Sequence, residues 1–403
     1  MRFLPASAAP EAKRILFARG LRAVADGLVA ATLSKFLTLH GFSEARIGVL
    51  VTATLLGSAV IVIGVARFAD RAGAGQILRW CSVAMAITGV LFAVVPWFVA
   101  LAAIAAVGPL NPSSGDVSAF SPAEQSLIPS TVNDADRTAL FARYSLVGFA
   151  AAAVGSAMAG LPLRIGRALE WTQRRSLTMV FWFYAVVGAL CIGLYGPLAR
   201  LGSGRAGERS RLGPSKRNVQ RLTALFCIDA AGGGMVVTSL LAIWLDRRHH
   251  FSLAQVGGTL SAMGLLSSLS ALAAPSLARR IGLVRTMVFT HIPANILLIL
   301  AAFAPNGPTA VGLLLARALF SQMDVPARQS YVMSIVQPAE RTAAAAYTNV
   351  PRSLASASTP ALAGWLLGRS TFGWPLVIGG VMKTTYDLLL LRQFGRVTPE
   401  EAT

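Results

Sequence analysis

Charged side chains are scarce in this 403-residue sequence. Asp, Glu, Lys and Arg together make up 13% of it, whereas soluble domains carry about 25%. Hydrophobic residues make up 55%, and the mean hydropathy is +0.62. Water does not tolerate a surface of this composition, but a lipid bilayer does. The composition therefore predicts an all-α membrane protein.

Cysteine and histidine are also rare. The three cysteines lie inside apolar runs, and neither they nor the four histidines have the spacing of metal ligands or of a disulfide framework. The sequence has no phosphate-binding P-loop, so ATP does not drive this protein directly. We therefore predict no enzyme activity, no catalytic residues, no metal site and no cofactor.

The formal net charge of +19 raises the question of nucleic-acid binding. The Lys and Arg residues, however, lie in short segments between apolar runs, and no zinc-finger, helix-turn-helix or RNA-stacking pattern accompanies them. We therefore exclude nucleic acid as a partner and interpret the basic residues as a signal of membrane topology.

A membrane-spanning helix needs about 20 mostly apolar residues, which leaves room for about twelve spans. The expected spans are residues 15–37, 46–66, 77–97, 99–129, 139–162, 176–198, 220–245, 253–275, 284–304, 308–334, 343–367 and 372–391. Pro112, Pro122 and Pro326 are expected to interrupt spans four and ten. Lys and Arg concentrate in alternate connecting segments, which predicts an inner or plasma membrane location with both termini cytoplasmic. The basic cluster at Arg164–Arg175 is the exception to this pattern.

The two halves of the chain resemble one another. PAEQSLIPSTVNDADRTA (122–139) aligns with PARQSYVMSIVQPAERTA (326–343), and FADRAGAGQIL (68–78) aligns with LARRIGLVRTM (277–287), at offsets of 204 and 209. Internal repeats of this kind are typical of transporters whose site lies between the halves. We predict two pseudo-symmetric six-helix bundles, residues 1–199 and 220–403, joined by a basic cytoplasmic linker at 200–219.

The turn after the second expected span resembles the signature of the major facilitator superfamily, G-x-L-x-D-R-x-G-R-R. Asp70, Arg71 and Gly73 match this signature, whereas its first glycine and its two final arginines are replaced. The resemblance implies alternating access, with the Asp70 turn latching one conformation. The alternative is that Asp70 only caps its own turn. Gly73 and its counterpart Gly282 are expected where the backbone turns tightly.

Ionisable residues inside the expected spans are candidates for the solute site, because a charge at bilayer depth is costly. In span one, Arg22 and Asp26 share a helix face at i,i+4 spacing. They either form a structural pair or line the cavity. Asn111, in the polar run NPSSGD of span four, is also expected to line the cavity.

Spans four and ten carry polar stripes that the offset of 204 relates. Asp116 in span four, with Arg317 and Asp324 in span ten, is assigned to the solute cavity. Glu124 and Arg328 lie near the expected cytoplasmic ends, where a gate ion pair and a ligand contact are equally compatible with the pattern. We assign these two residues to the gate.

Asp229 in span seven is the expected proton-coupling residue. No basic residue lies within one turn of it on its own helix, so it is expected to be freer to titrate than Asp26. The alternative is a carboxylate that is hydrogen-bonded in a helix interface. Arg352 in span eleven is the expected counter-charge either to Glu124 or to the solute, and we assign it to the gate. Lys383 and Asp387 in the last span are expected to form a structural i,i+4 pair.

These features predict a secondary transporter that moves a small solute by alternating access, driven by protons and directed towards export. The alternatives are an uptake carrier for a small polar or anionic metabolite and a non-transporting membrane sensor or scaffold. Drug exporters of the superfamily often carry an arginine early in span four and a Gly-Pro pair in span five, and both are absent here. The expected partners are the solute, a coupling proton and the bilayer, and a monomer is expected.

Overall fold

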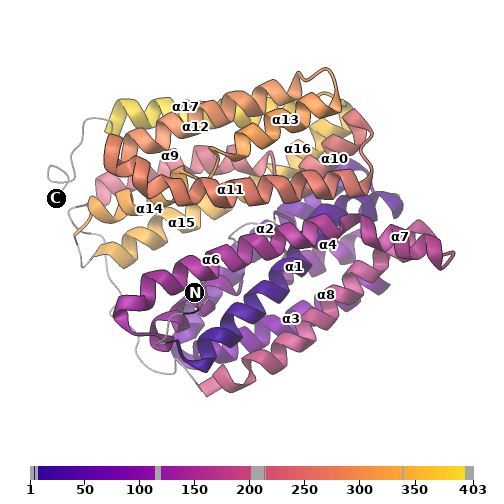
Figure 1. Ribbon diagram of the computed structural model, residues 1–403, viewed down its shortest axis with the longest axis horizontal. Helices are drawn as coiled ribbons and strands as arrows, with labels where there is room; N and C mark the ends of the chain where they lie inside the picture. The colour runs from indigo at the N-terminus through magenta and orange to yellow at the C-terminus, as the bar shows by residue number, and fades with distance from the viewer. Residues whose placement is uncertain are drawn as a thin grey trace. The chain divides into compact units, whose positions relative to one another are not determined.

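The computed structural model describes residues 8–113, 119–200, 215–337 and 340–394, together with Leu4 and Gly213. Side chains are not described at residues 63, 65–72, 134–135, 137–139, 199–200, 271, 341–343 and 345–346. Within the described residues, all regular secondary structure is helical (Figure 1). The chain divides into two compact units, the first formed by residues 1–205 and 251–261 and the second by residues 206–250 and 262–403.

The helices follow one another along the chain with short connections. In the first unit they are α1 (Pro10–Leu39), α2 (Glu44–Ala72), α3 (Ala74–Val94), α4 (Phe98–Val107), α5 (Ser121–Leu127), α6 (Asp134–Ala157), α7 (Leu161–Ala168) and α8 (Gln173–Tyr195), with 3₁₀ turns at Ile128–Thr131, Met158–Gly160 and Gly196–Arg200. The second unit contains α9 (Lys216–Gly234), α10 (Thr238–His249), α12 (Leu283–Ala302), α13 (Gly307–Ala318), α14 (Asp324–Ser334), α15 (Arg341–Ser358), α16 (Pro360–Arg369) and α17 (Trp374–Phe394). Helix α11 (Leu253–Ile281) contributes its first residues to the first unit and the rest to the second.

Each of the twelve predicted spans corresponds to one helix or to two consecutive helices. The unbroken spans are α1, α2, α3, α8, α11, α12 and α17, and the broken spans are α4–α5, α6–α7, α9–α10, α13–α14 and α15–α16. Pro122 stands in the first turn of α5, and Pro326 stands near the start of α14. Since proline lacks the N–H that a helix interior requires, both residues fit the beginning of a new helix better than the middle of an old one.

Six stretches of the described chain are long and apolar enough to cross a membrane. They are Glu44–Val62, Ala74–Val94, Leu140–Ala168, Gln173–Leu198, Lys216–His249 and Leu283–Ala302. Helix α11 makes a seventh if its two parts, which meet at 41°, are taken as one span. Helices α1 and α17 are also long, but α1 carries Arg19, Arg22 and Asp26, and α17 carries Lys383 and Asp387.

Small residues bring helices of the first unit into close contact. Helix α1 packs between α6 and α8 (Figure 1). A Cβ atom on Gly27 of α1 would overlap the backbone of Ala152 in α6, and one on Gly155 of α6 would overlap the backbone of Val24 in α1. This reciprocal contact requires glycine at both positions, because any side chain would push the two helices apart.

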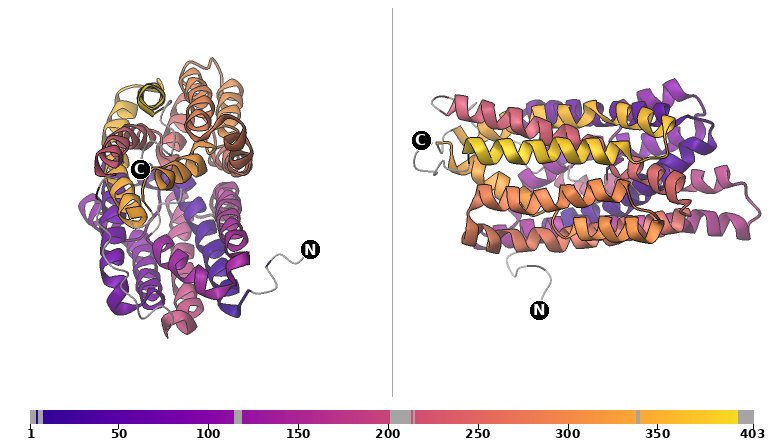
Figure 2. Two further views of the ribbon diagram at one scale, coloured as in Figure 1. Left: turned by 90° about the vertical axis from the view of Figure 1, so that its left-hand side faces the viewer. Right: turned by 90° about the horizontal axis from the view of Figure 1, so that it is seen from above.

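In the second unit, α9 packs against α15 and α17, and α17 packs against α12 (Figure 2). A Cβ atom on Gly232 of α9 would lie 2.9 Å from the backbone oxygen of Gly379 in α17. Helix α9 ends at Gly234, and α10 begins at Thr238. The consecutive glycines Gly232, Gly233 and Gly234 therefore allow close helix packing and also mark the break in span seven.

Two glycines form one-residue turns between consecutive helices. Gly73 separates α2 from α3 with φ = 77°, and Gly282 separates α11 from α12 with φ = 86°. These backbone conformations are available almost only to glycine. Asp70 and Arg71 belong to the last turn of α2, and their side chains lie outside the described residues.

Candidate functional site

Each unit contains a buried group of charged side chains. In the first unit the group consists of Arg22, Glu124, Tyr144 and Tyr195, hereafter the Arg22 cluster. In the second unit the Asp229 cluster consists of Asp229, His291, Asn295, Asp324, Arg328, Arg352, Lys383 and Asp387. Charges at this depth persist only where partners compensate them, so both clusters are candidates for function.

The Arg22 cluster is centred on an ion pair between α1 and α5. Nη2 of Arg22 lies 2.6 Å from Oε1 of Glu124, and the two side chains are 1% and 0% exposed. Tyr144 of α6 donates a hydrogen bond of 2.6 Å to Oε2 of Glu124, and Tyr195 of α8 donates one to Oε1. Four helices therefore meet at one carboxylate. Because both of its oxygens are satisfied, the pair is a stable part of this unit.

Aromatic rings cover the cationic side of this cluster. The guanidinium carbon of Arg22 lies 3.8 Å from the ring centroid of Phe120, within cation–π range. The corresponding atom of Arg19 lies 5.0 Å from the centroid of Tyr144. These rings exclude water, and in a dry environment the attraction between Arg22 and Glu124 is stronger.

Asp26 lies one turn after Arg22 on α1 and is also buried. The ion pair that the structure gives to Arg22 runs to Glu124, on another helix. Within the described part of the chain, Asp26 has neither an ion pair nor a hydrogen bond of its own. The ion pair between Arg22 and Asp26 that i,i+4 spacing allows is therefore not formed in this structure.

Asp229 in α9 is surrounded by cations from three other helices. Nζ of Lys383 in α17 lies 2.6 Å from its Oδ1 atom. Nη1 of Arg328 in α14 lies 3.3 Å from Oδ2, and Nη2 of Arg352 in α15 lies 4.0 Å from the same atom. Arg328 also contacts Asp324, one turn before it on α14, at 3.0 Å.

His291 of α12 stands between two carboxylates. Its Nδ1 atom lies 3.0 and 3.1 Å from the two oxygens of Asp387 in α17, and its Nε2 atom lies 3.7 Å from Oδ1 of Asp229. Asn295, one turn further along α12, donates a hydrogen bond of 3.0 Å to Asp387. All four side chains are buried. One ring nitrogen of His291 is therefore within hydrogen-bond distance of a carboxylate of α17, and the other is within ion-pair distance of a carboxylate of α9.

The charges in contact within the Asp229 cluster balance when His291 is neutral. Three cations, Arg328, Arg352 and Lys383, accompany three carboxylates, Asp229, Asp324 and Asp387. Arg317 of α13 acts electrostatically on Asp324 and Asp229 and adds a fourth positive charge nearby.

Comparison with known proteins identifies the family. A family model described as the Major Facilitator Superfamily matches residues 15–321 and, in a second match, residues 222–402. The chain belongs to the Major Facilitator Superfamily. It is therefore a multi-pass membrane transporter with twelve helices in two six-helix bundles.

Relatives and solved structures agree with this assignment. An uncharacterized membrane protein of Saccharomyces cerevisiae is 23% identical over 411 residues, which cover 93% of this chain and 92% of the yeast protein. The nucleoside transporter NupG superposes with a TM-score of 0.72 at 12% identity, covering 97% of this chain and 100% of that structure. A bacterial homologue of the human lysosomal transporter Spinster, inward-facing and occupied, gives 0.73 at 16% identity, covering 96% and 97%. At these identities the structures establish the fold shared within the Major Facilitator Superfamily.

The sequence analysis separated residues that the structure brings together. Arg22, assigned to the cavity, pairs with Glu124, assigned to the gate. Asp324, assigned to the cavity, shares Arg328 with the predicted coupling residue Asp229. Asn111 is buried at the α4–α5 break and makes a turn with Ser113. Asp116 lies outside the described residues.

The structure changes the pairing of two residues. Asp229 has no basic residue within one turn on its own helix, as the sequence indicated, but Lys383, Arg328 and Arg352 reach it from other helices. Lys383 and Asp387 were expected to pair with each other, but Lys383 binds Asp229 and Asp387 binds His291. In both cases the helix packing supplies a nearer partner than the residue's own helix does.

Sequence reasoning also missed several members of these clusters. His291 was considered only as a metal ligand, and Asn295 was not considered, although both are polar residues in the middle of a predicted span, which is itself a signal. Tyr144 and Tyr195 were missed because tyrosine is common in membrane helices and gives no such signal.

Outside the membrane-spanning region, Glu340 forms a hydrogen bond with the segment that precedes span seven. Its Oε1 atom accepts a hydrogen bond from the backbone N–H of Gly213, three residues before α9. Hydrogen bonds from Ser215 and from Gly213 lower the pKa of the Glu340 carboxyl below its ordinary value. Glu340, which lies in the segment AERTA that corresponds to ADRTA in the first half, therefore anchors the beginning of α9, the helix that carries Asp229.

Proposed function

We propose that this transporter is a secondary carrier that couples the movement of a small solute to protons and works as an exporter. It lies in an inner or plasma membrane as a monomer, with both termini cytoplasmic. The arrangement that supports proton coupling best is the position of His291 between Asp387 and Asp229.

Protonation of His291 changes the contacts of Asp229. Lys383 and His291 face the same oxygen, Oδ1 of Asp229, at 2.6 and 3.7 Å. When His291 carries a proton, it becomes a fourth cation in contact with the cluster and competes with Lys383 for that oxygen. The proton thus weakens one contact between α9 and α17. A change of this kind biases the equilibrium between two conformations, which is what coupling requires.

Export in exchange for protons requires that the transporter does not bind the proton and the solute at the same time. A cationic group on the solute would compete with protonated His291 for Asp229, so that entry of a proton displaces the solute. Asp26 in the first unit, buried and without a described ion pair, offers a second carboxylate for such a group. We therefore propose a small solute with a basic group.

The second candidate is proton-driven uptake of an anionic solute. Arg317 adds a positive charge beside Asp324, and the side chain of Arg352 is 34% exposed although its cluster is buried. A protonated His291 would increase this positive surplus and favour an anion. In that case proton and solute move in the same direction.

Proton flux in liposomes tests the proposal and separates its two versions. Purified protein is reconstituted with a trapped pH-sensitive dye, and cationic, neutral and anionic small solutes are added outside. An inward gradient of the correct solute should alkalinise the lumen for exchange and acidify it for uptake together with protons. His291→Gln should abolish the pH change and retain exchange of labelled solute.

The matched control is His250→Asn, at an exposed position with φ = 55° that asparagine tolerates. It should leave proton movement unchanged. Proton movement at the wild-type rate in His291→Gln would remove His291 from the coupling mechanism.

The latch at Asp70 and Arg71 is part of the same proposal, and it rests on the match to the family signature. Asp70→Asn is expected to slow transport while expression and fold remain intact.

The proposed topology has its own test. Reporter fusions at residue 210 and at the C-terminus are expected to report the cytoplasm, and a signal from the opposite side at either site would overturn the proposed topology.

A further inference from the structure

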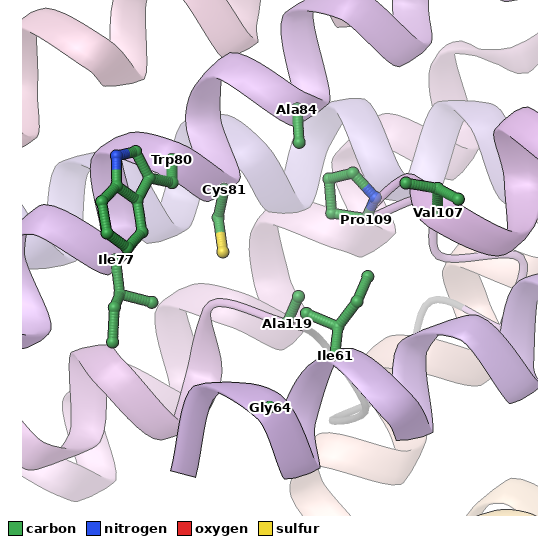
Figure 3. Close-up of a pocket in the computed structure, with 9 residues that line it drawn as sticks. All are labelled: Ile61, Gly64, Ile77, Trp80, Cys81, Ala84, Val107, Pro109 and Ala119. Carbon is green, nitrogen blue, oxygen red and sulfur yellow. The ribbon is translucent and has the colours of Figure 1, made fainter. Parts of the chain in front are cut away.

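An apolar pocket of about 310 Å³ lies inside the first unit, between α2, α3 and the connection from α4 to α5 (Figure 3). Helix α2 contributes Ile61 and Gly64, and α3 contributes Trp80 and Cys81 among others. None of the nine described residues that line the pocket has a charged group or an oxygen atom in its side chain. None of these nine residues belongs to either cluster described above.

The rim of the pocket belongs to an exposed apolar surface. Trp80 is 54% exposed, and Val107, which also lines the pocket, is 75% exposed. Trp80 begins a row of exposed apolar side chains at helical spacing, formed by Trp80, Val83, Ile87, Val90 and Val94. An apolar row along a spanning helix faces hydrocarbon, because water would not tolerate it. The pocket is therefore continuous with the surface that meets the bilayer.

Water is a poor occupant for such a pocket. A buried water needs at least two polar partners, and apolar cavities of about 150 Å³ stay dry and bind small hydrocarbons instead. This pocket is about twice that size and lies at the lower limit of the volumes that ligands occupy. The bilayer beside Trp80 supplies hydrocarbon chains at high concentration.

The inner wall of the pocket adjoins the Arg22 cluster. Ala119 lines the pocket, and the next residue, Phe120, holds its ring 3.8 Å from the guanidinium of Arg22. Both Arg22 and Glu124 act electrostatically on the Cys81 thiol in the pocket wall. A hydrocarbon occupant would keep water away from this side of the ion pair, and the pair is stronger in dry surroundings.

We propose that this pocket binds one acyl chain of a membrane phospholipid, which enters past Trp80 from the bilayer. The bound lipid is a component of the folded first unit that seals the Arg22 cluster, and it is distinct from the transported solute.

A glycine in the wall provides a direct test. Gly64 lines the pocket, and a Cβ atom there would meet nothing within 4 Å, so Gly64→Leu starts a side chain at the pocket wall without displacing backbone. Gly193 of α8 is equally free of neighbours and does not line the pocket, so Gly193→Leu is the matched control. Both changes also replace glycine by a better helix former.

Wild-type protein and both variants are reconstituted with a phospholipid that carries a photoactivatable diazirine near the end of one acyl chain. The adducts are then located by peptide mass spectrometry. In the wild type, the segment around Trp80 and Cys81 should be labelled. Gly64→Leu should reduce this labelling about tenfold, since lost burial of a few methylene groups already corresponds to that factor. Gly193→Leu should leave it unchanged.

Labelling of the exposed face of α8, at Trp182, Val186 and Leu190, reports ordinary contact with surrounding lipid and should be equal in all three proteins. Undiminished labelling near Trp80 in Gly64→Leu would overturn the proposal, as would an equal loss in Gly193→Leu. Labelling of the pocket by a water-soluble alkyl diazirine but not by the phospholipid would assign it to a solute and also overturn the proposal. If Gly64→Leu is not monodisperse, Ala84→Leu, which enters the pocket from α3, replaces it with the same expected outcomes.

Discussion

Glu124 and Arg328 lie 204 residues apart, the offset that relates the two halves of the chain, and they carry opposite charges. Each makes a buried ion pair with the first span of its own unit: Glu124 with Arg22 of α1, and Arg328 with Asp229 of α9. The repeated scaffold thus keeps an ion pair at equivalent places and reverses its polarity. This reversal makes the two units chemically different where they are structurally alike.

Removing one member of the first pair should be costly. Glu124→Gln leaves the Arg22 guanidinium buried without its carboxylate, and we expect a loss of about 3–5 kcal/mol in the free energy of unfolding. Unfolding of the detergent-solubilised protein followed by circular dichroism measures this loss. The double variant Arg22→Met/Glu124→Gln should recover most of it, whereas the exposed control Glu170→Gln should change little. A double variant no more stable than Glu124→Gln would contradict the pairing.

Asp229 should behave differently, because it has several cationic partners. Asp229→Asn is expected to abolish solute accumulation driven by a proton gradient and to spare exchange of solute down its own gradient. It also leaves Lys383 without its carboxylate, so some stability should be lost. Lys383→Met in the same chain should restore stability but not driven accumulation. Driven accumulation by Asp229→Asn at the wild-type rate would remove this residue from coupling.

Asp26 offers the contrast of a buried carboxylate without a described ion pair. Asp26→Asn should change the free energy of unfolding by about 1 kcal/mol or less. Solute binding, measured by thermal stabilisation with the solute found in liposomes, should weaken about tenfold or more. Intact binding together with a large loss of stability would show that Asp26 serves the fold instead.

The one-residue turn at Gly282 should require glycine for conformational reasons alone. No atom lies within 4 Å of the position where its Cβ would stand, but its φ of 86° disfavours any other residue. Gly282→Ala is expected to cost about 1–3 kcal/mol. Gly258→Ala, inside α11 with equally free surroundings, should be neutral or stabilising by up to about 1 kcal/mol. Equal effects of the two substitutions would show that the turn is not what requires Gly282.

Glu340 should control the order of the chain that leads into α9. Its pKa is lowered in the folded protein by hydrogen bonds from Ser215 and Gly213. The stabilisation is therefore complete above the pKa of the unfolded chain and is lost as the pH falls through the lower folded value. Glu340→Ala should increase hydrogen exchange of the backbone amides at 213–219 at pH 7. The control Glu11→Ala, at the start of α1, should not affect this segment, and unchanged exchange in Glu340→Ala would refute the anchor.

The sequence was sufficient to predict the spans and their order, because each span is an apolar run. The internal repeat also relates segments of the first half to segments of the second half. It also indicated that Glu124 and Arg328 are equivalent positions. It could not indicate their partners. Lys383 and Asp229 are 154 residues apart, and Arg328 and Asp229 are 99 apart. A single sequence shows only neighbours on the same helix. For this reason Lys383 was paired with Asp387, and Asp229 was expected to titrate more freely than Asp26.

The break after Gly234 gives span seven a mechanical property that an unbroken helix lacks. Where α9 ends, the carbonyl of Ala231 accepts a long hydrogen bond of 3.3 Å from the backbone N–H of Met235. Thr359, at the start of α16, donates a shorter one of 2.7 Å to the same oxygen. About one and a half turns of helix separate Gly234 from the charges around Asp229. Span seven therefore consists of two helices joined at glycines, and a single hydroxyl group connects the end of the first helix to the break between α15 and α16.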